Sequence, residues 1–180
     1  MPFFDTHTHL DYLHHDTGEP LAQLVDNAKQ ADVQKILIVA VKESDFKTIQ
    51  NMTALFPEHL YCGLGLHPLY IKEHQEHDLE KLDTALSVRN QNCTAVAEIG
   101  LECAIPDLLT DKLWQKQQHF LESQLHLAKK YKMPSLNAAV VSTAVFLIVS
   151  APTTSAVTAN LITDGKSATD LLALAGSYLP

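Results

Sequence analysis

The sequence is poor in positive charge. Its 180 residues carry 13 lysines and arginines against 21 aspartates and glutamates, which gives a formal net charge of −8 and a pI near 5.6. A surface of this sign repels phosphates, so the composition argues against non-specific polyanion binding through a basic face. If the substrate is a nucleic acid, bound metal ions must supply most of the local positive charge.

Cysteines and long apolar runs are also scarce. Cys62, Cys93 and Cys103 are too few and too widely spaced for a disulfide framework or a CxxC metal knuckle. We therefore expect reduced thiols and a cytoplasmic protein. The N-terminus lacks the charged and apolar regions of a signal peptide, and the apolar segment 138–149 is too short to span a bilayer. We expect no membrane association and no obligate protein partner.

Four short apolar runs alternate with longer segments of helical periodicity. The predicted strands are 2–7, 35–41, 60–67 and 94–101, and the predicted helices are 20–31, 43–56, 79–88 and 110–132. This alternation predicts an α/β protein with parallel strands and crossover helices. Because the strands are apolar almost throughout, we expect both faces of the sheet to be covered.

A doubly wound sheet and a (β/α)8 barrel both fit this alternation, and a missing motif separates them. A dinucleotide-binding sheet needs a Gly-rich turn after its first strand, but this chain has Asp5-Thr6-His7-Thr8-His9 there. The other unusual polar residues, His67 and Glu98, also belong to strand ends in this prediction. Because barrel enzymes gather their chemistry where strands end, we expect the N-terminal half of a TIM-like (β/α)8 barrel over residues 1–134.

The His-Thr-His segment predicts a metal site. Residues two apart in a strand point to the same side, so His7 and His9 can present two imidazoles together. Neutral imidazole is a good ligand for zinc and other divalent ions. Asp5 or Asp11 could orient one of these rings by accepting a hydrogen bond from the ring nitrogen that does not bind the metal. The alternative is a chance HxH pair in a protein with ten histidines.

Glu98 is an acidic residue inside an apolar strand, Ala-Glu-Ile-Gly-Leu at 97–101. Burying a lone carboxylate is costly, and a bound metal relieves that cost. An ion-paired core glutamate or a strand end near water are the alternatives. We predict Glu98 as a metal ligand.

His67 ends the third predicted strand in Gly-Leu-His-Pro. It can contact substrate or donate to a phosphate oxygen, and the alternative is a turn histidine with a local partner. We expect the remaining histidines to be loop or helix-surface residues without a role, namely His14, His15, His59, His74, His77, His119 and His126.

The motifs together resemble one family. Asp-Thr-His-Thr-His-Leu-Asp at 5–11, Gly-Leu-His-Pro at 65–68, Ala-Glu-Ile-Gly-Leu at 97–101 and the helical segment 115–134 are similar to the TatD-related metal-dependent deoxyribonucleases, which are amidohydrolase-like barrels. The resemblance covers residues 3–134. It implies that His7, His9 and Glu98 bind one or two divalent ions (Mg²⁺, Mn²⁺ or Zn²⁺), with Glu98 shared between two ions.

The resemblance also implies that His67 lies on the substrate side of the pocket. The family usually has aspartate at the position of Glu102, so no catalytic role is assigned to Glu102.

Residues 135–180 depart from the family pattern. Alanine, serine and threonine make up nearly half of them, the charged residues are Asp164, Lys166 and Asp170, and the last histidine of the chain is His126. The family's later histidines and late aspartate have no counterpart, so the catalytic residue stays unknown. We favour a shifted reading frame after about residue 135 over a divergent ending, and we expect a tail unlike the second half of a barrel.

The predicted function is metal-dependent hydrolysis of phosphodiesters, with DNA as the expected substrate and weak or no activity in this chain. The alternatives are another HxH barrel hydrolase, either a phosphoesterase of the polymerase-and-histidinol-phosphatase type or a C–N amidohydrolase, and a non-catalytic metal-binding fragment.

Overall fold

The computed structural model describes residues 2–141 and 144–150. Its strands are β1 (Phe3–Thr8), β2 (Val33–Val39), β3 (Leu60–Leu64), β4 (Cys93–Glu102), β5 (Ser135–Val141) and β6 (Ala144–Ser150). Its α-helices are α1 (Leu10–Thr17), α2 (Leu21–Gln30), α3 (Phe46–Leu55), α4 (Glu76–Ser87) and α5 (Asp111–Tyr131). Short 3-10 turns cover Glu43–Asp45, Pro68–Tyr70 and Pro106–Leu108.

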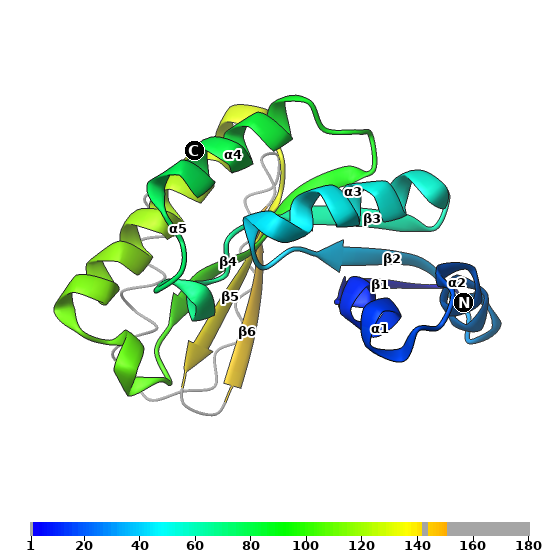
Figure 1. Cartoon of the computed structure of the whole chain (residues 1–180), viewed down its shortest axis with the longest axis horizontal. Helices are drawn as coiled ribbons and strands as arrows, with labels where there is room; N and C mark the ends of the chain where they lie inside the picture. Colours follow the sequence, from blue (N-terminus) through cyan, green and yellow to red (C-terminus); the bar gives the residue numbers. More distant parts are fainter. Residues whose placement is uncertain (1, 142–143, 151–180) are drawn as a thin grey trace.

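The strands lie side by side in the order in which they occur in the chain, β1-β2-β3-β4-β5-β6. Each neighbouring pair from β1 to β5 is parallel, whereas β6 is antiparallel to β5. A doubly wound sheet reverses its strand order partway along the chain, and this one does not. Sequential parallel order is the winding of a barrel (Figure 1).

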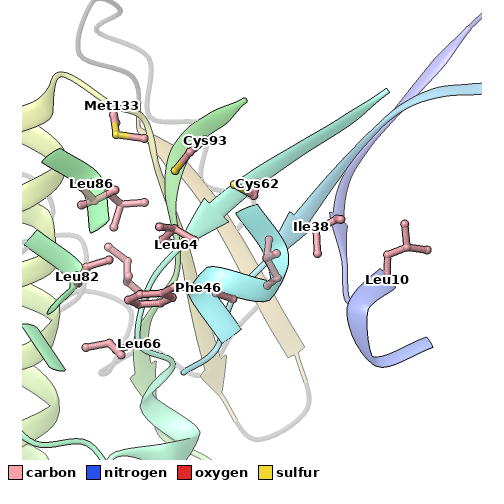
Figure 2. Close-up of a cluster of buried hydrophobic side chains, with 14 of the residues drawn as sticks. Leu10, Ile38, Phe46, Cys62, Leu64, Leu66, Leu82, Leu86, Cys93 and Met133 are labelled. Atoms are coloured by element: carbon pink, nitrogen blue, oxygen red, sulfur yellow. The ribbon is translucent and has the colours of Figure 1, made fainter. Parts of the chain in front are cut away.

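The main core lies between the sheet and the helices. Buried side chains from each helix pack on one face of the strands, among them Leu24 and Phe120. Leu10, Phe46 and Leu82 of the same cluster are labelled in Figure 2. A smaller cluster of Leu37, Val39, Ala95, Ala97 and Leu136 lies on the opposite face. Helices on a single face and a second apolar cluster on the other are expected of a barrel wall, whose second face points inward.

Most of the predicted elements are present, and three differ. The helix α1 was not predicted, because its residues 10–17 include two histidines and two aspartates and show only weak helical patterning. The third strand ends at Leu64 rather than His67. A fifth parallel strand starts at Ser135, so the sheet continues past the boundary predicted at residue 134.

The prediction of a divergent tail over 135–180 falls largely on residues 142–143 and 151–180, which lie outside the described residues. It stays a prediction. Within the described part of the chain, none of the helices combines the length and apolar character needed to cross a membrane. The three cysteines are free thiols. Cys62 and Cys93 lie opposite each other in the register of β3 and β4.

Candidate metal centre

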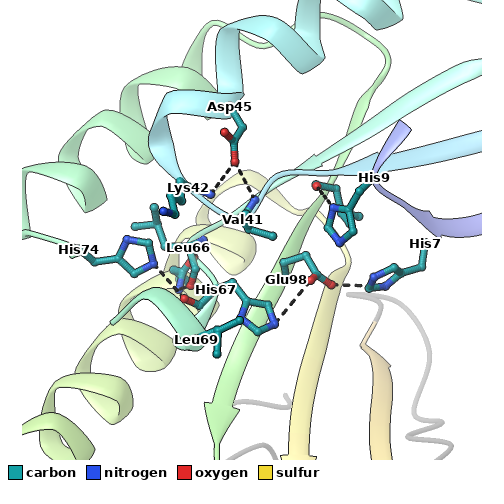
Figure 3. A network of polar contacts seen from close by, with 12 residues as sticks. His7, His9, Val41, Lys42, Asp45, Leu66, His67, Leu69, His74 and Glu98 are labelled. Carbon is teal, nitrogen blue, oxygen red and sulfur yellow. Dashed lines mark hydrogen bonds and ion pairs between the residues drawn. The ribbon is translucent and has the colours of Figure 1, made fainter. Parts of the chain in front are cut away.

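The side chains of His7, His9 and Glu98 converge on one point. One ligand atom from each lies within 4.8 Å of the other two. His7 Nδ1 is 3.3 Å from Glu98 Oε1, and the two imidazole rings are 5.5 Å apart between centroids. In Figure 3 both rings and the carboxylate point into the same space. Among the described residues, this is the one group in which three histidine, cysteine or acidic side chains lie this close together.

The convergence does not arise in the predicted way. We expected the three side chains at the ends of adjacent strands, but β2 and β3 separate β1 from β4 in the sheet. Glu98 also lies in the middle of β4, which runs from Cys93 to Glu102, rather than at the end of the strand. The twist and curvature of the sheet bring β1 and β4 toward each other.

A β-bulge turns Glu98 toward the histidines. The register of β4 with β5 shifts between Ala97 and Ile99, and Glu98 has a left-handed φ of 61°. Val96 and Ile99 both face the helix-side core although they are three residues apart. In a regular strand Glu98 would share the face of Val96, so the extra residue redirects its side chain out of that core.

The backbone beside Glu98 packs against two glycines of the Cys62-Gly63-Leu64-Gly65 segment. A β-carbon at Gly63 would lie 2.4 Å from the Ala97 β-carbon, and one at Gly65 would lie 1.9 Å from the Ala97 carbonyl oxygen. Neither position has room for a side chain. The Gly-Leu-His-Pro motif therefore places glycine at a point of close strand contact next to the bulge.

The carboxylate of Glu98 is buried and incompletely satisfied. The residue is 3% exposed, and burial raises its pKa to about 7. Its Oε1 atom makes no hydrogen bond within the described structure, although His7 Nδ1 lies 3.3 Å away. Burial, followed by the neighbouring His9, lowers the pKa of His7. A carboxylate oxygen without a hydrogen-bond partner beside two imidazoles fits a divalent cation, which would keep Glu98 ionised.

Backbone contacts fix opposite tautomers in two of the histidines. His9 Nδ1 lies 3.2 Å from the Val39 carbonyl oxygen, so this nitrogen carries the proton and leaves the Nε2 lone pair for a metal. In His67, Nδ1 accepts the Leu69 N–H at 3.0 Å, so a neutral His67 carries its proton on Nε2. His9 is therefore prepared as a ligand and His67 as a donor.

His67 lies three residues beyond the end of β3, at the start of the 3-10 turn 68–70. Its Nε2 still reaches to 3.6 Å from Glu98 Oε2, which is longer than a hydrogen bond. Burial, followed by the nearby His9 and His7, lowers the pKa of His67 to about 4. A neutral N–H donor thus faces the centre from the side opposite the His7–His9 pair (Figure 3).

Neither of the two aspartates suggested as supports for the histidine rings makes a hydrogen bond to a ring nitrogen of His7 or His9 among the described contacts. Asp5 accepts a hydrogen bond from the His7 backbone N–H at 3.0 Å. Asp11 is buried on α1, and its Oδ1 makes no hydrogen bond within the described structure. The Val39 carbonyl, rather than a carboxylate, orients His9.

The sequence reasoning missed several polar residues around the centre. His74, which we expected at the surface, is 3% exposed, and its Nε2 donates to the His67 carbonyl oxygen at 2.9 Å. Gln117 and Gln124 of α5 are fully buried and bind the backbone of Glu102 and Leu66. Their spacing of seven residues, which places both amides on one helix face, was the available signal.

Comparison with known proteins gives a consistent result. A family model described as TatD related DNase matches residues 4–136. An uncharacterized metal-dependent hydrolase of Haemophilus influenzae is 75% identical over 134 residues, which make up 74% of this chain and 51% of that protein. The human deoxyribonuclease TATDN3 is 26% identical over 136 residues, which cover 72% of this chain and 49% of that protein.

The crystal structure of YJJV, a TatD homologue from Escherichia coli K12, aligns with a TM-score of 0.65 at 34% identity, covering 75% of this chain and 49% of that one. The chain therefore spans about half the length of the relatives it matches. The likeness confirms the expected fold, a parallel α/β sheet corresponding to part of a TIM-like barrel. Because the family model covers most of its length, the chain belongs to the TatD-related DNase family.

Proposed function

We propose that this chain carries part of the centre of a divalent-metal-dependent phosphodiesterase that acts on DNA. The observation that carries the proposal is the convergence of His7, His9 and Glu98 around a carboxylate oxygen without a hydrogen-bond partner. Two imidazoles and one carboxylate are a ligand set found in hydrolytic metal centres, where three protein ligands leave a position open for water.

Each side chain has a distinct task in this proposal. His9 binds through Nε2 while the Val39 carbonyl holds its ring. Glu98 supplies the negative ligand, and His7 completes the set. A divalent ion held by these three side chains would supply Lewis-acid chemistry, by polarising a phosphoryl oxygen and lowering the pKa of water. Its charge would also offset the unfavourable approach of DNA to a chain with a net charge of −8.

His67 serves the substrate rather than the ion. Its Nε2–H faces the centre, and a protonated nitrogen has no lone pair to offer a cation. The same N–H donates readily to a phosphate oxygen. We assign His67 to phosphate binding, with the human relative's name, deoxyribonuclease, as the support for DNA as the polymer.

Metal binding is the first test. Thermal unfolding is followed with Mg²⁺, Mn²⁺ and Zn²⁺ in the wild type, His9→Ala, Glu98→Gln and the control His15→Ala, whose side chain is highly exposed on α1. A ligand at one hundred times its Kd stabilises the folded state by about 2.7 kcal/mol. We expect a metal-dependent rise in Tm that His15→Ala retains and the two site variants lose. A rise that survives both site substitutions would overturn the assignment of these ligands.

Hydrolysis is the second test, with a labelled DNA oligonucleotide and bis(p-nitrophenyl) phosphate as substrates. We expect weak metal-stimulated cleavage, close to background, that Glu98→Gln removes. The rate is low because the described residues supply three ligands for one ion, and loss of a general base costs a factor of about 10² to 10⁴. Metal-dependent cleavage of a C–N substrate, with neither phosphodiester hydrolysed, would instead favour an amidohydrolase.

A further inference from the structure

We propose that His74 is a positioning residue that holds His67 so that its Nε2–H points to the substrate phosphate. This inference rests on the proposed function, because it gives His67 a phosphate to bind. It concerns a histidine outside the metal ligand set, on the segment that joins the 68–70 turn to α4.

The main chain of His67 is held on both sides. Its N–H donates to the Val41 carbonyl oxygen at 2.9 Å, which attaches it to the segment that follows β2. Its carbonyl oxygen accepts the Tyr70 N–H at 3.1 Å and His74 Nε2 at 2.9 Å. Because a carbonyl oxygen only accepts, His74 must carry its proton on Nε2. The bond is therefore directional, from the imidazole to the backbone of His67.

His74 is itself held by α5. Its ring stacks on Phe120, with 5.8 Å between centroids and 17° between planes, and its carbonyl oxygen accepts a hydrogen bond from Lys116. Its backbone N–H donates to Tyr70 at 3.2 Å. These contacts form a continuous series from α5 through His74 to the His67 carbonyl, seen in part in Figure 3.

Packing alone does not explain an imidazole at this position. A leucine would fill the space beside Phe120 without the cost of burying a polar ring. Burial also lowers the pKa of His74, so the ring is held in the neutral form. The feature that an apolar side chain cannot reproduce is the hydrogen bond to His67.

The orientation of the His67 ring depends on this support. The Leu69 N–H reaches His67 Nδ1 only while residues 67–70 keep the geometry of the turn, and that bond leaves the proton on Nε2. If the His67 carbonyl loses its second donor, the turn has more freedom and Nδ1 is less firmly bound. The tautomer of His67 is then a direct measure of what His74 does.

The test follows the imidazole nitrogens of His67 by ¹⁵N NMR in the metal-free full chain. We compare the wild type, His74→Leu, which packs but cannot donate, and His74→Gln, whose terminal amide can donate to the carbonyl. We expect one Nε2–H tautomer in the wild type, a mixture in His74→Leu, and recovery in His74→Gln. A single unchanged tautomer in His74→Leu would overturn the proposal.

Binding of dithymidine monophosphate in the presence of Mg²⁺ gives the second readout. We expect His74→Leu to weaken this binding roughly tenfold, as for one lost charge-assisted hydrogen bond, with no change in the Mg²⁺-dependent rise in Tm. His74→Gln should bind like the wild type. Equal losses in Leu and Gln would show a merely structural role. Loss of the metal response in the wild type would instead count against the proposed function, whatever the tautomer of His67.

Discussion

At the scale of the residue, Glu98 combines two unfavourable features at one position. Its backbone is left-handed, which costs a residue other than glycine about 1–2 kcal/mol. Its carboxylate is buried with one oxygen lacking a hydrogen bond. Strain of this kind is retained where the surroundings over-determine it, commonly at functional sites. The same bulge that strains the backbone directs the carboxylate to His7 and His9.

Replacing Glu98 separates these two features. Glu98→Gly and Glu98→Ala both remove the carboxylate, but only glycine relieves the left-handed backbone. Relief of about 1–2 kcal/mol is opposed by about 0.5–1 kcal/mol of added chain entropy. We therefore expect metal-free Glu98→Gly to be more stable than Glu98→Ala by roughly 0.5–1 kcal/mol, measured by urea unfolding. If the alanine variant is the more stable one, residue 98 does not have the left-handed backbone.

The residues of the centre could be predicted because each is out of place in its local pattern. Paired histidines at a strand end and an acid in an apolar strand are visible in the sequence. His74 could not be predicted, because residues 72–78 are all charged or polar, as in a surface loop, and its burial depends on Phe120 forty-six residues away. The sequence also gave no indication of the tautomers, which depend on backbone groups brought in by folding.

At the scale of the element, two glutamine side chains of α5 form hydrogen bonds with backbone groups at or just beyond the ends of β3 and β4. Gln124 Oε1 accepts the Leu66 N–H at 2.7 Å, and its Nε2 donates to the Leu66 carbonyl at 3.2 Å. Gln117 makes the equivalent contact with the Glu102 N–H at 2.7 Å. Backbone groups that leave a parallel ladder need partners when they are buried. The two amides supply them at the ends of the strands that carry the centre.

Removing one amide tests this role. Gln124→Met keeps the volume of the side chain but leaves both Leu66 backbone groups without their partner. We expect a loss of about 1–3 kcal/mol in the free energy of unfolding. Gln118→Met, at an exposed position of the same helix, is the control and should change stability by less than about 0.5 kcal/mol. Similar small effects at both positions would contradict the assignment.

The contact between α4 and α5 should depend on pH. Asp83 accepts hydrogen bonds from Lys130 and Tyr131, and these lower its carboxyl pKa below the ordinary 3.8. A lowered pKa in the folded state stabilises it above the unfolded value and ceases to do so as pH falls through the folded value. The difference in unfolding free energy between wild type and Asp83→Asn should therefore be present at about pH 6 and vanish in strong acid. In a Lys130→Met background, where the first of the two donors is absent, the difference at about pH 6 should be smaller.

Helices and strands differed in how well their limits could be predicted. The predicted helices 20–31 and 110–132 match α2 and α5 closely, because apolar spacing and flanking prolines mark their ends. The predicted end of β3 was wrong by three residues, whereas the predicted strand 94–101 matches β4 to within one residue at each end. The end of β3 depends on pairing with its neighbours, which the residues of the strand itself do not encode.

At the scale of the whole molecule, the candidate ligands belong to regions of unequal burial. Glu98 lies in β4, whose residues are almost all buried. His7 lies in β1, the outermost of the described strands on its side of the sheet, and Phe3–His7 are exposed. Strands with few buried contacts open at lower free energy than core strands. A metal bound by these three side chains would link the exposed strand β1 to the buried strand β4.

Amide hydrogen exchange can test this difference along the sheet. We expect the amides of β1 to exchange faster than those of β3 and β4 in the metal-free chain. Saturating metal should slow exchange in β1 selectively, because ligand binding stabilises the closed form by mass action. Glu98→Gln should remove this protection without changing the rates of β3. Equal slowing of all strands would show instead that β1 opens only with the rest of the sheet.

The position of β1 also affects what a measured metal affinity means. Two of the three candidate ligands are in place only while β1 is docked on β2, so the apparent Kd equals the intrinsic Kd divided by the docked fraction. Every tenfold loss of docked β1 weakens apparent binding tenfold, although no ligand has changed. In this chain, metal affinity therefore reports on the attachment of one strand as well as on the chemistry of the site. A substitution in β1 away from His7 can therefore weaken metal binding solely by loosening the pairing of β1 with β2.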